Sequence, residues 1–195
     1  AELVGLGFCW GENIDDIAYI PIGHNLSLDI ERSNHKQIDL KIVAESLSDW
    51  FESRLHPKVL QNTKYDRLIL LRHGISLGGV VMDTLLADYV RDPNAKHGLE
   101  AMAEREFGFV PKGFEQLVEK GKTFADVSLE EASQYCGMDV FVTRKLFFRL
   151  TELLKIIGSD IINLLTKVEQ PLEEVLATME VNGITINTKY LEKLS

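Results

Sequence analysis

Short apolar runs alternate with longer helical repeats over the first 150 residues of the chain. Residues 3–10 and 18–22 are β-prone runs around a turn-like segment, which predicts a β-hairpin. Residues 58–60 and 80–82 are shorter apolar runs that predict buried strands. The remaining periodic segments repeat apolar residues every three or four positions and predict helices over residues 38–55, 64–73, 84–90, 99–107 and 128–154.

The pattern becomes wholly helical after residue 155, with apolar periodicity over residues 156–165 and 168–182. Alternating strands and helices followed by helices alone predict an α/β unit over residues 1–165 and the start of a second unit over residues 166–195. Polar residues 25–36 predict a surface loop, and the glycine-rich residues 108–128 predict irregular structure.

Composition sets broad limits on the class of protein. A chain of 195 residues with 45% hydrophobic and 26% charged residues is typical of a soluble globular protein. It contains no apolar run of about 18 residues, so we predict no membrane span. Residues 1–5 lack the basic start of a signal peptide, and two distant cysteines, Cys9 and Cys136, indicate free thiols in an intracellular protein.

The net charge of −9 argues against a broadly basic nucleic-acid-binding surface. It does not exclude a nucleic-acid end as a substrate, because metal ions and base stacking can supply the binding.

Candidate chemistry begins with Tyr135 and Asp139, which are four residues apart and therefore share one face of the predicted helix. A carboxylate there can ligate a hard divalent ion, and a phenol one turn away can orient the water that the ion activates. The same pair is also common on exposed helices, where both groups are simply solvated.

Asn62 and Asp66 show the same spacing at a predicted strand-to-helix turn, and such turns collect ligands in α/β proteins. The alternative is a helix-capping Asn62 beside a solvated Asp66. Asp83 follows a buried strand and suits either a ligand or a helix cap. For His97 we favour a packing or hydrogen-bonding role over that of a ligand or base.

Taken in order, these motifs resemble the proofreading 3′–5′ exonuclease domain of bacterial-type DNA polymerase I, within the ribonuclease H-like exonuclease superfamily. Residues 60–89 match almost continuously, and residues 168–184 resemble the junction with the polymerase domain. The resemblance covers essentially the whole chain. Its two central motifs are Gln61-Asn62-Thr63-Lys64-Tyr65-Asp66 and Tyr135-Cys136-Gly137-Met138-Asp139.

The resemblance implies a ribonuclease H-like mixed sheet flanked by helices. It implies hydrolysis of single-stranded DNA 3′ ends by two-metal catalysis, for proofreading, with Mg²⁺ or Mn²⁺ as the two ions of the complete domain. Residues 1–165 would be the exonuclease-like domain, and residues 166–195 would begin the polymerase domain of the same parent chain. We expect no membrane partner and a cytoplasmic (nucleoid) or organellar location.

By the same resemblance, two carboxylates and three further side chains form the site. Asp139 would bind the hydrolytic ion, and Tyr135 would hold the attacking water. Asp66 would support the second ion, Asn62 would help to shape the site, and Phe114 would stack against the terminal base. Such stacking tolerates any base, which suits an enzyme that removes whichever nucleotide was misincorporated.

In the family, the first strand carries an Asp-x-Glu motif and lies in the middle of the sheet. We find no such motif at the expected place, so we expect that central strand to be missing and the activity of this chain to be weak or absent. Asp29-Ile30-Glu31 has the Asp-x-Glu sequence but lies in the predicted loop, where we do not expect it to replace the missing motif.

Two other functions are weighed against the exonuclease. One is a non-catalytic module that binds DNA ends or supports a polymerase domain. The other is an RNA-trimming relative such as ribonuclease D, against which the polymerase-like residues 168–184 argue.

Overall fold

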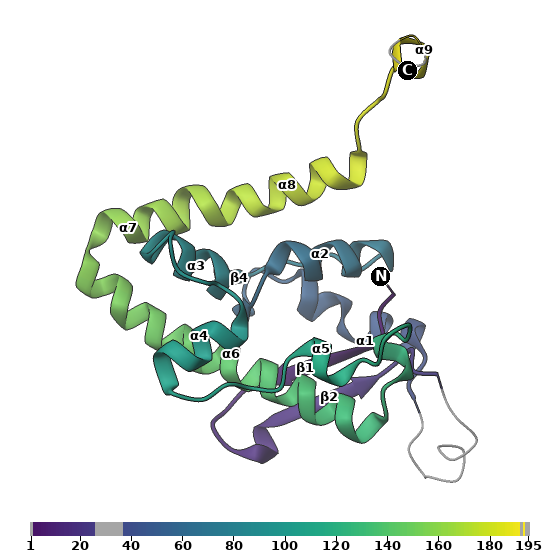
Figure 1. Cartoon of the computed structure of the whole chain (residues 1–195), viewed down its shortest axis with the longest axis horizontal. Coiled ribbons are helices and arrows are strands. Elements are labelled where there is room, and N and C mark those ends of the chain that lie inside the picture. The colour runs from purple at the N-terminus through teal and green to yellow at the C-terminus, as the bar shows by residue number, and fades with distance from the viewer. Residues whose placement is uncertain (1, 26–36, 192, 194–195) are drawn as a thin grey trace.

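The computed structural model of the chain describes residues 2–25, 37–191 and 193 (Figure 1). The long helix α6 (Leu129–Ile157) is the element around which these residues are arranged. It packs against β1 (Gly5–Cys9) and β2 (Ile17–Pro21), and it also reaches β3 (Lys58–Leu60) of a second sheet. Helix α6 therefore joins parts of the fold that share no strand pairing.

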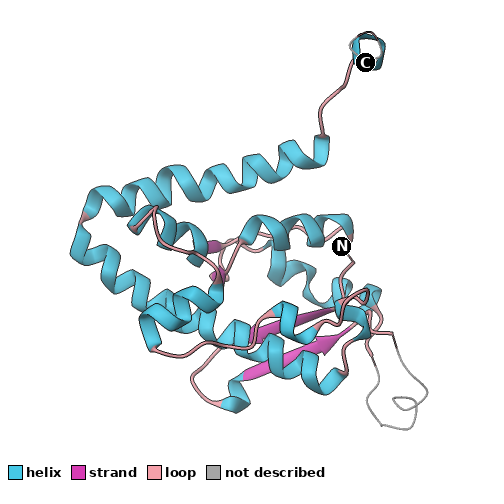
Figure 2. Cartoon of the chain, in the orientation of Figure 1, coloured by secondary structure: helices cyan, strands magenta, loops and turns pink. Residues whose placement is uncertain are grey.

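The described strands form two separate two-stranded sheets (Figure 2). In the first, β1 and β2 pair antiparallel with Gly5 opposite Pro21, which confirms the predicted hairpin. In the second, β3 pairs parallel with β4 (Val80–Asp83). The α/β class and the ribonuclease H-like fold are confirmed. Among the described strands, none joins the two sheets into one.

Helices predicted between residues 38 and 154 are all found, with small shifts at their ends. Two short helical turns also occur in the region predicted to be irregular, because local capping closes them without apolar periodicity. The helices are α1 (Leu40–Glu52), α2 (Thr63–Arg72), α3 (Thr84–Arg91), α4 (Leu99–Phe107), α5 (Phe114–Leu117) and the 3₁₀ turn η2 (Phe124–Asp126).

The main core lies between α6 and the helices α3 and α4. Residues on one stripe of α6, three or four positions apart, are almost fully buried there. A second cluster joins α1 and α2 to β1 and β3 around Phe51 and Leu70. The buried stripe of α6 consists of Val142, Leu146, Leu150 and Leu154.

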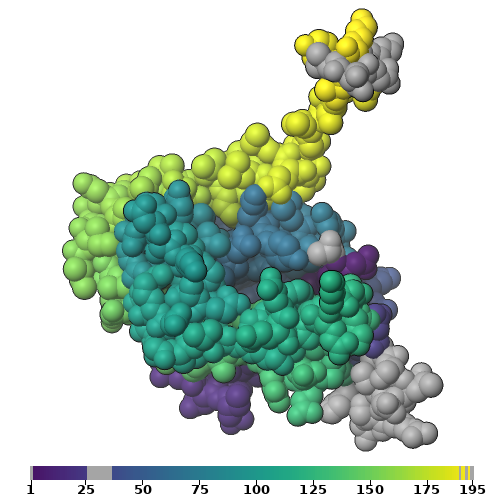
Figure 3. All heavy atoms as spheres, viewed as in Figure 1, coloured from purple at the N-terminus to yellow at the C-terminus, as the bar shows by residue number. Residues whose placement is uncertain are grey.

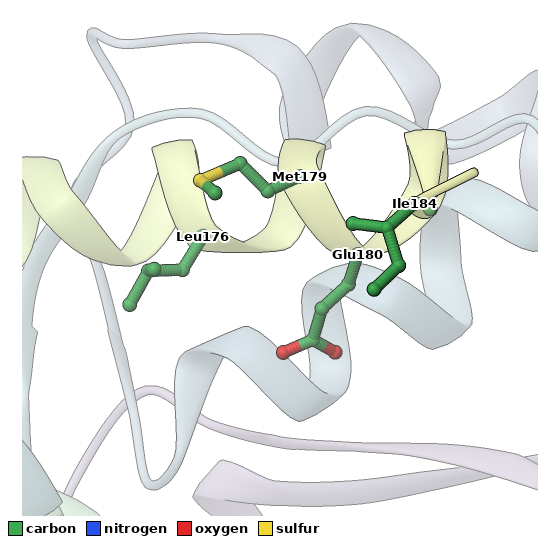
Figure 4. A pocket seen from close by; sticks show the side chains of 5 residues that line it. Leu176, Met179, Glu180 and Ile184 are labelled. Carbon is green, nitrogen blue, oxygen red and sulfur yellow. The ribbon is translucent and has the colours of Figure 1, made fainter. Parts of the chain in front are cut away.

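After α6 the chain turns through α7 (Ser159–Leu164) and a π-helical turn (Leu165–Glu169) into α8 (Gln170–Asn182). Helix α8 packs along α2, and the chain beyond it projects toward α9 (Thr188–Leu191) (Figures 1 and 3). An open pocket of about 320 Å³ lies at the end of α8 beside Leu176, Met179 and Ile184 (Figure 4). In the part of the chain that the structure describes, no helix is both long enough and apolar enough to cross a membrane.

The core predicts where the fold is most sensitive to truncation. Leu146→Ala should lower the free energy of unfolding by about 2–5 kcal/mol, because the substitution leaves a cavity beside α6 that the surrounding core fills only in part. Ile156→Ala, on the same helix but at an 81% exposed position, should change it by less than about 0.5 kcal/mol. Urea denaturation of both variants measures the difference, and equal losses would contradict this account of the core.

Candidate active site

The turns that follow β3 and β4 are tied together by the buried carboxylate of Asp83. Its Oδ1 accepts hydrogen bonds from the backbone N–H groups of Asn62, at 3.0 Å, and Leu85, at 2.9 Å. Its Oδ2 accepts from the N–H of Thr63 at 2.7 Å. Asp83 therefore caps α3 and holds the first turn of α2. Of the two roles open from the sequence, this geometry favours the structural cap.

Asn62 occupies an uncommon backbone conformation directly before α2. Its φ of 62° lies in the left-handed region, which asparagine tolerates better than most residues. Asn62 occupies the N-cap position of α2, as the alternative expected, but its exposed side chain makes no capping hydrogen bond. Strained backbone of this kind clusters at functional sites, where the surrounding structure holds it in place. Here the hydrogen bond from Asn62 to Asp83 provides that support.

The structure brings Asp66 of α2 and Asp139 of α6 into one half-buried region. Burial raises the pKa of Asp66 to about 7, and the negative charge of Asp83 adds to this rise. Burial likewise raises the pKa of Asp139 to about 7, which the hydrogen bond from Tyr135 opposes and the charge of Glu100 reinforces.

The thiol of Cys136, one turn from Asp139 on α6, lies within electrostatic range of both carboxylates. Burial raises the pKa of Cys136 to about 12, and the charges of both Asp139 and Asp66 add to the rise. Residues 73 positions apart in the sequence therefore act on the same group. Cys136 itself forms no disulfide and serves as a small residue against which Gly7 of β1 packs.

These two carboxylates fit the ligand chemistry of a hard divalent ion. None of the charged groups that shift their pKa values is a cation, so a bound cation would offset the cost of burying the two carboxylates and their repulsion by Asp83 and Glu100. Within residues 2–25 and 37–191, however, no group of three or more His, Cys, Asp or Glu side chains could hold a metal by itself. The pair therefore suits an ion of the Mg²⁺ type, which is commonly bound by one or two carboxylates together with water and phosphate oxygens.

Three aromatic rings connect the carboxylates to solvent. Tyr135 is hydrogen-bonded to Asp139, and its ring lies against Phe124 with the centroids 5.8 Å apart. Phe124 in turn stacks on Phe114, at 6.1 Å and an interplanar angle of 16°. Phe114 is 48% exposed, so part of its ring remains available. Phe124 is not among the residues predicted from the sequence, because an aromatic residue ten positions after Phe114 is only a weak signal.

Other sequence candidates have structural partners. His97 directs Nδ1 at the buried carboxylate of Asp88, at 2.7 Å, which agrees with the favoured hydrogen-bonding role. Lys64, in the first of the two motifs, pairs with Glu180 of α8. The Asp-x-Glu spelling at residues 29–31 lies outside the described residues.

Comparison with known proteins identifies the class to which this site belongs. Residues 18–155 match the family model described as 3′-5′ exonuclease. This stretch includes both carboxylates and all three aromatic rings described above. The chain therefore belongs to the 3′–5′ exonuclease family.

Its relatives show the kind of protein in which this domain occurs. The chain is 41% identical to DNA polymerase I of Synechocystis over its full length, and 32% identical to DNA polymerase I of Pseudomonas aeruginosa over 98% of its length. It covers 19% and 21% of these relatives, so it spans about a fifth of their length. It is thus an exonuclease domain of the DNA polymerase I type.

A solved structure shares the fold. The POL domain of Pol1 from M. smegmatis, in complex with DNA primer-template and dNTP, matches with a TM-score of 0.67 and 25% sequence identity. The match covers 92% of this chain and 26% of that one.

The buried carboxylates predict a dependence of stability on pH. Because the folded-state pKa of Asp139 lies above its ordinary value, its contribution to stability is greatest near pH 4 and is lost as the pH rises through 7. In a metal-free buffer, Asp139→Asn should therefore be more stable than the unchanged chain at pH 8, by more than about 1 kcal/mol, and should lose this advantage below about pH 4, where the carboxyl is protonated in both the folded and the unfolded chain. Urea unfolding at both pH values measures it.

Asp49→Asn, at an exposed position of α1, is the matched control and should leave stability unchanged at both pH values. If Asp139→Asn were less stable than the unchanged chain at pH 8, burial of the ionised carboxylate would not be destabilising, and the prediction would be wrong.

Proposed function

We propose that the chain is the proofreading domain of a DNA polymerase I, hydrolysing single-stranded DNA from its 3′ end with Mg²⁺ or Mn²⁺. The observation that supports this most is the convergence of Asp66 and Asp139 from two helices in one half-buried region with no cation among the charges that shift their pKa values. A divalent ion bound there would offset the cost of burying the two carboxylates. Residues 166–195 would begin the polymerase domain of the same parent chain.

In this proposal the two carboxylates would hold the ions. Asp139 would hold the ion that activates the attacking water, and Asp66 would hold the ion that stabilises the leaving 3′ oxygen. Bound metal would supply a more acidic water and neutralise charge on the phosphate. Water adds to the phosphorus of the terminal phosphodiester, the bond to the preceding 3′ oxygen breaks, and that oxygen takes up a proton as a nucleoside monophosphate leaves.

The remaining residues would orient the strand end and the water. Burial and the charge of Asp139 raise the pKa of Tyr135, so its hydroxyl stays protonated and donates to that carboxylate. The oxygen of the same hydroxyl can still accept a hydrogen bond from the attacking water. Phe114 would stack on the terminal base, and the exposed amide of Asn62 would line the edge of the site.

We further propose that activity of the chain by itself is weak. No third protein ligand joins Asp66 and Asp139 among the described side chains, and low ligand number lowers metal occupancy. This same observation favours the second candidate function, a non-catalytic module that binds DNA ends or supports a polymerase domain.

Incubation with a 5′-labelled single-stranded oligonucleotide distinguishes these functions. In Mg²⁺ or Mn²⁺ we expect slow shortening from the 3′ end, abolished by Asp139→Ala and by chelation of the metal. An oligonucleotide that is bound but never shortened would reject the exonuclease in favour of the binding module. If the oligonucleotide is neither bound nor shortened, both functions are rejected.

Phe114 provides a separate test of how the strand end is bound. Phe114→Ala should weaken oligonucleotide binding by about 1–3 kcal/mol whichever base is terminal, because one stacking surface is lost. Phe148→Ala is the matched control, since Phe148 is equally exposed, at 48%, but lies on α6 outside the ring contacts of the site. Fluorescence anisotropy measures both, and equal losses would remove Phe114 from the binding surface.

A further inference from the structure

Helices α2 and α8 share a buried ion pair that the proposed chemistry does not use. The Nε and Nη2 atoms of Arg67 donate to the two carboxylate oxygens of Glu173 at 2.8 Å and 2.9 Å. Its Nη1 donates to the carbonyl oxygen of Leu77 at 2.6 Å. The two charged side chains are only 8% and 6% exposed. Both carboxylate oxygens are thus matched by donors in a two-pronged geometry.

Stability alone is a poor explanation for this pair. Taking both charges out of water costs about as much as their attraction returns, so apolar residues of similar size often serve equally well. What a planar guanidinium adds is direction, because two parallel hydrogen bonds to one carboxylate fix the orientation of the groups that carry them.

The arginine of the ion pair lies on α2, the helix whose orientation affects the position of Asp66. Arg67 follows Asp66 directly in α2, a helix of ten residues whose first turn is held by Asp83. A second, more exposed ion pair joins Lys64 of α2 to Glu180, which extends from the far end of α8 (Figure 4). Contacts with α8 therefore determine how α2 is rotated about its axis, and that rotation sets where the carboxylate of Asp66 points.

We propose that Arg67 and Glu173 are positioning residues that fix α2 on α8 and so hold Asp66 in place relative to Asp139. The proposal rests on the proposed function for its catalytic consequence. It makes the geometry of the site depend on Glu173, which lies outside the residues 18–155 matched by the family model. Neither residue touches the reacting atoms.

Two variants and a matched control test this proposal in the full chain. Arg67→Lys keeps the charge but loses the fork, and the double variant Arg67→Met with Glu173→Met removes both charges and keeps much of the volume. The control replaces Lys41 and Glu45, an exposed ion pair of α1 at 3.9 Å, by Met in the same way. Urea unfolding first establishes that each protein is folded under the assay conditions.

For the variants we expect kcat on the labelled oligonucleotide to fall by roughly 10- to 100-fold, with KM changed less than about twofold, because Asp66 is misplaced rather than lost. Amide hydrogen exchange across residues 63–72 should become at least about tenfold faster, while that of the core stripe of α6 stays the same. The control should match the unchanged chain in every measurement.

A folded Met–Met variant with unchanged kcat and unchanged exchange in α2 would overturn the proposal. Should the unchanged chain itself not shorten the oligonucleotide, the proposed function has failed, and the exchange of α2 alone decides. Faster amide exchange of α2 in the variants then supports the proposal that Arg67 and Glu173 fix α2 on α8. Unchanged exchange rejects it.

Discussion

The burial of one stripe of α6 is the constraint on which the rest of the structure depends. The stripe runs through Val142, Leu146, Leu150 and Leu154, and these residues hold α3, α4 and α7 against the long helix. Toward the N-terminus of α6 the same face continues to Asp139, three positions before Val142, and then to Tyr135, four positions before Asp139. The face that builds the core therefore carries a carboxylate into a region where water is scarce.

This continuity explains why the site is electrostatically unfavourable without a ligand. A carboxylate on the solvated face of α6 would keep an ordinary pKa, whereas on this stripe burial raises the pKa of Asp139 to about 7. Asp66 meets the same conditions from α2, where the charge of Asp83 adds repulsion. The same burial that organises the fold thus makes the ionised forms of both carboxylates costly at neutral pH.

Local sequence patterns predicted most of the helices and strands, but not the contacts between distant residues. The spacing of Tyr135 and Asp139 predicted one helix face, and the short runs at residues 58–60 and 80–82 predicted two buried strands, all of which are present. Spacing does not reveal that Asp83 accepts three backbone hydrogen bonds from two turns. Nor does it reveal that Phe124 lies between Phe114 and Tyr135, because both depend on contacts between distant segments.

Glu173 illustrates why the limits of a domain in sequence need not be the limits of its cooperative structure. A division after residue 165 follows the change from alternating strands and helices to helices alone, yet the ion pair with Arg67 crosses it. Separating the two segments would leave the guanidinium of Arg67 buried without its carboxylate, directly beside Asp66. An uncompensated buried charge is more costly than a missing contact, so α2 would have to move to bring Arg67 to water. Helix α8 is therefore physically part of the site that α2 carries.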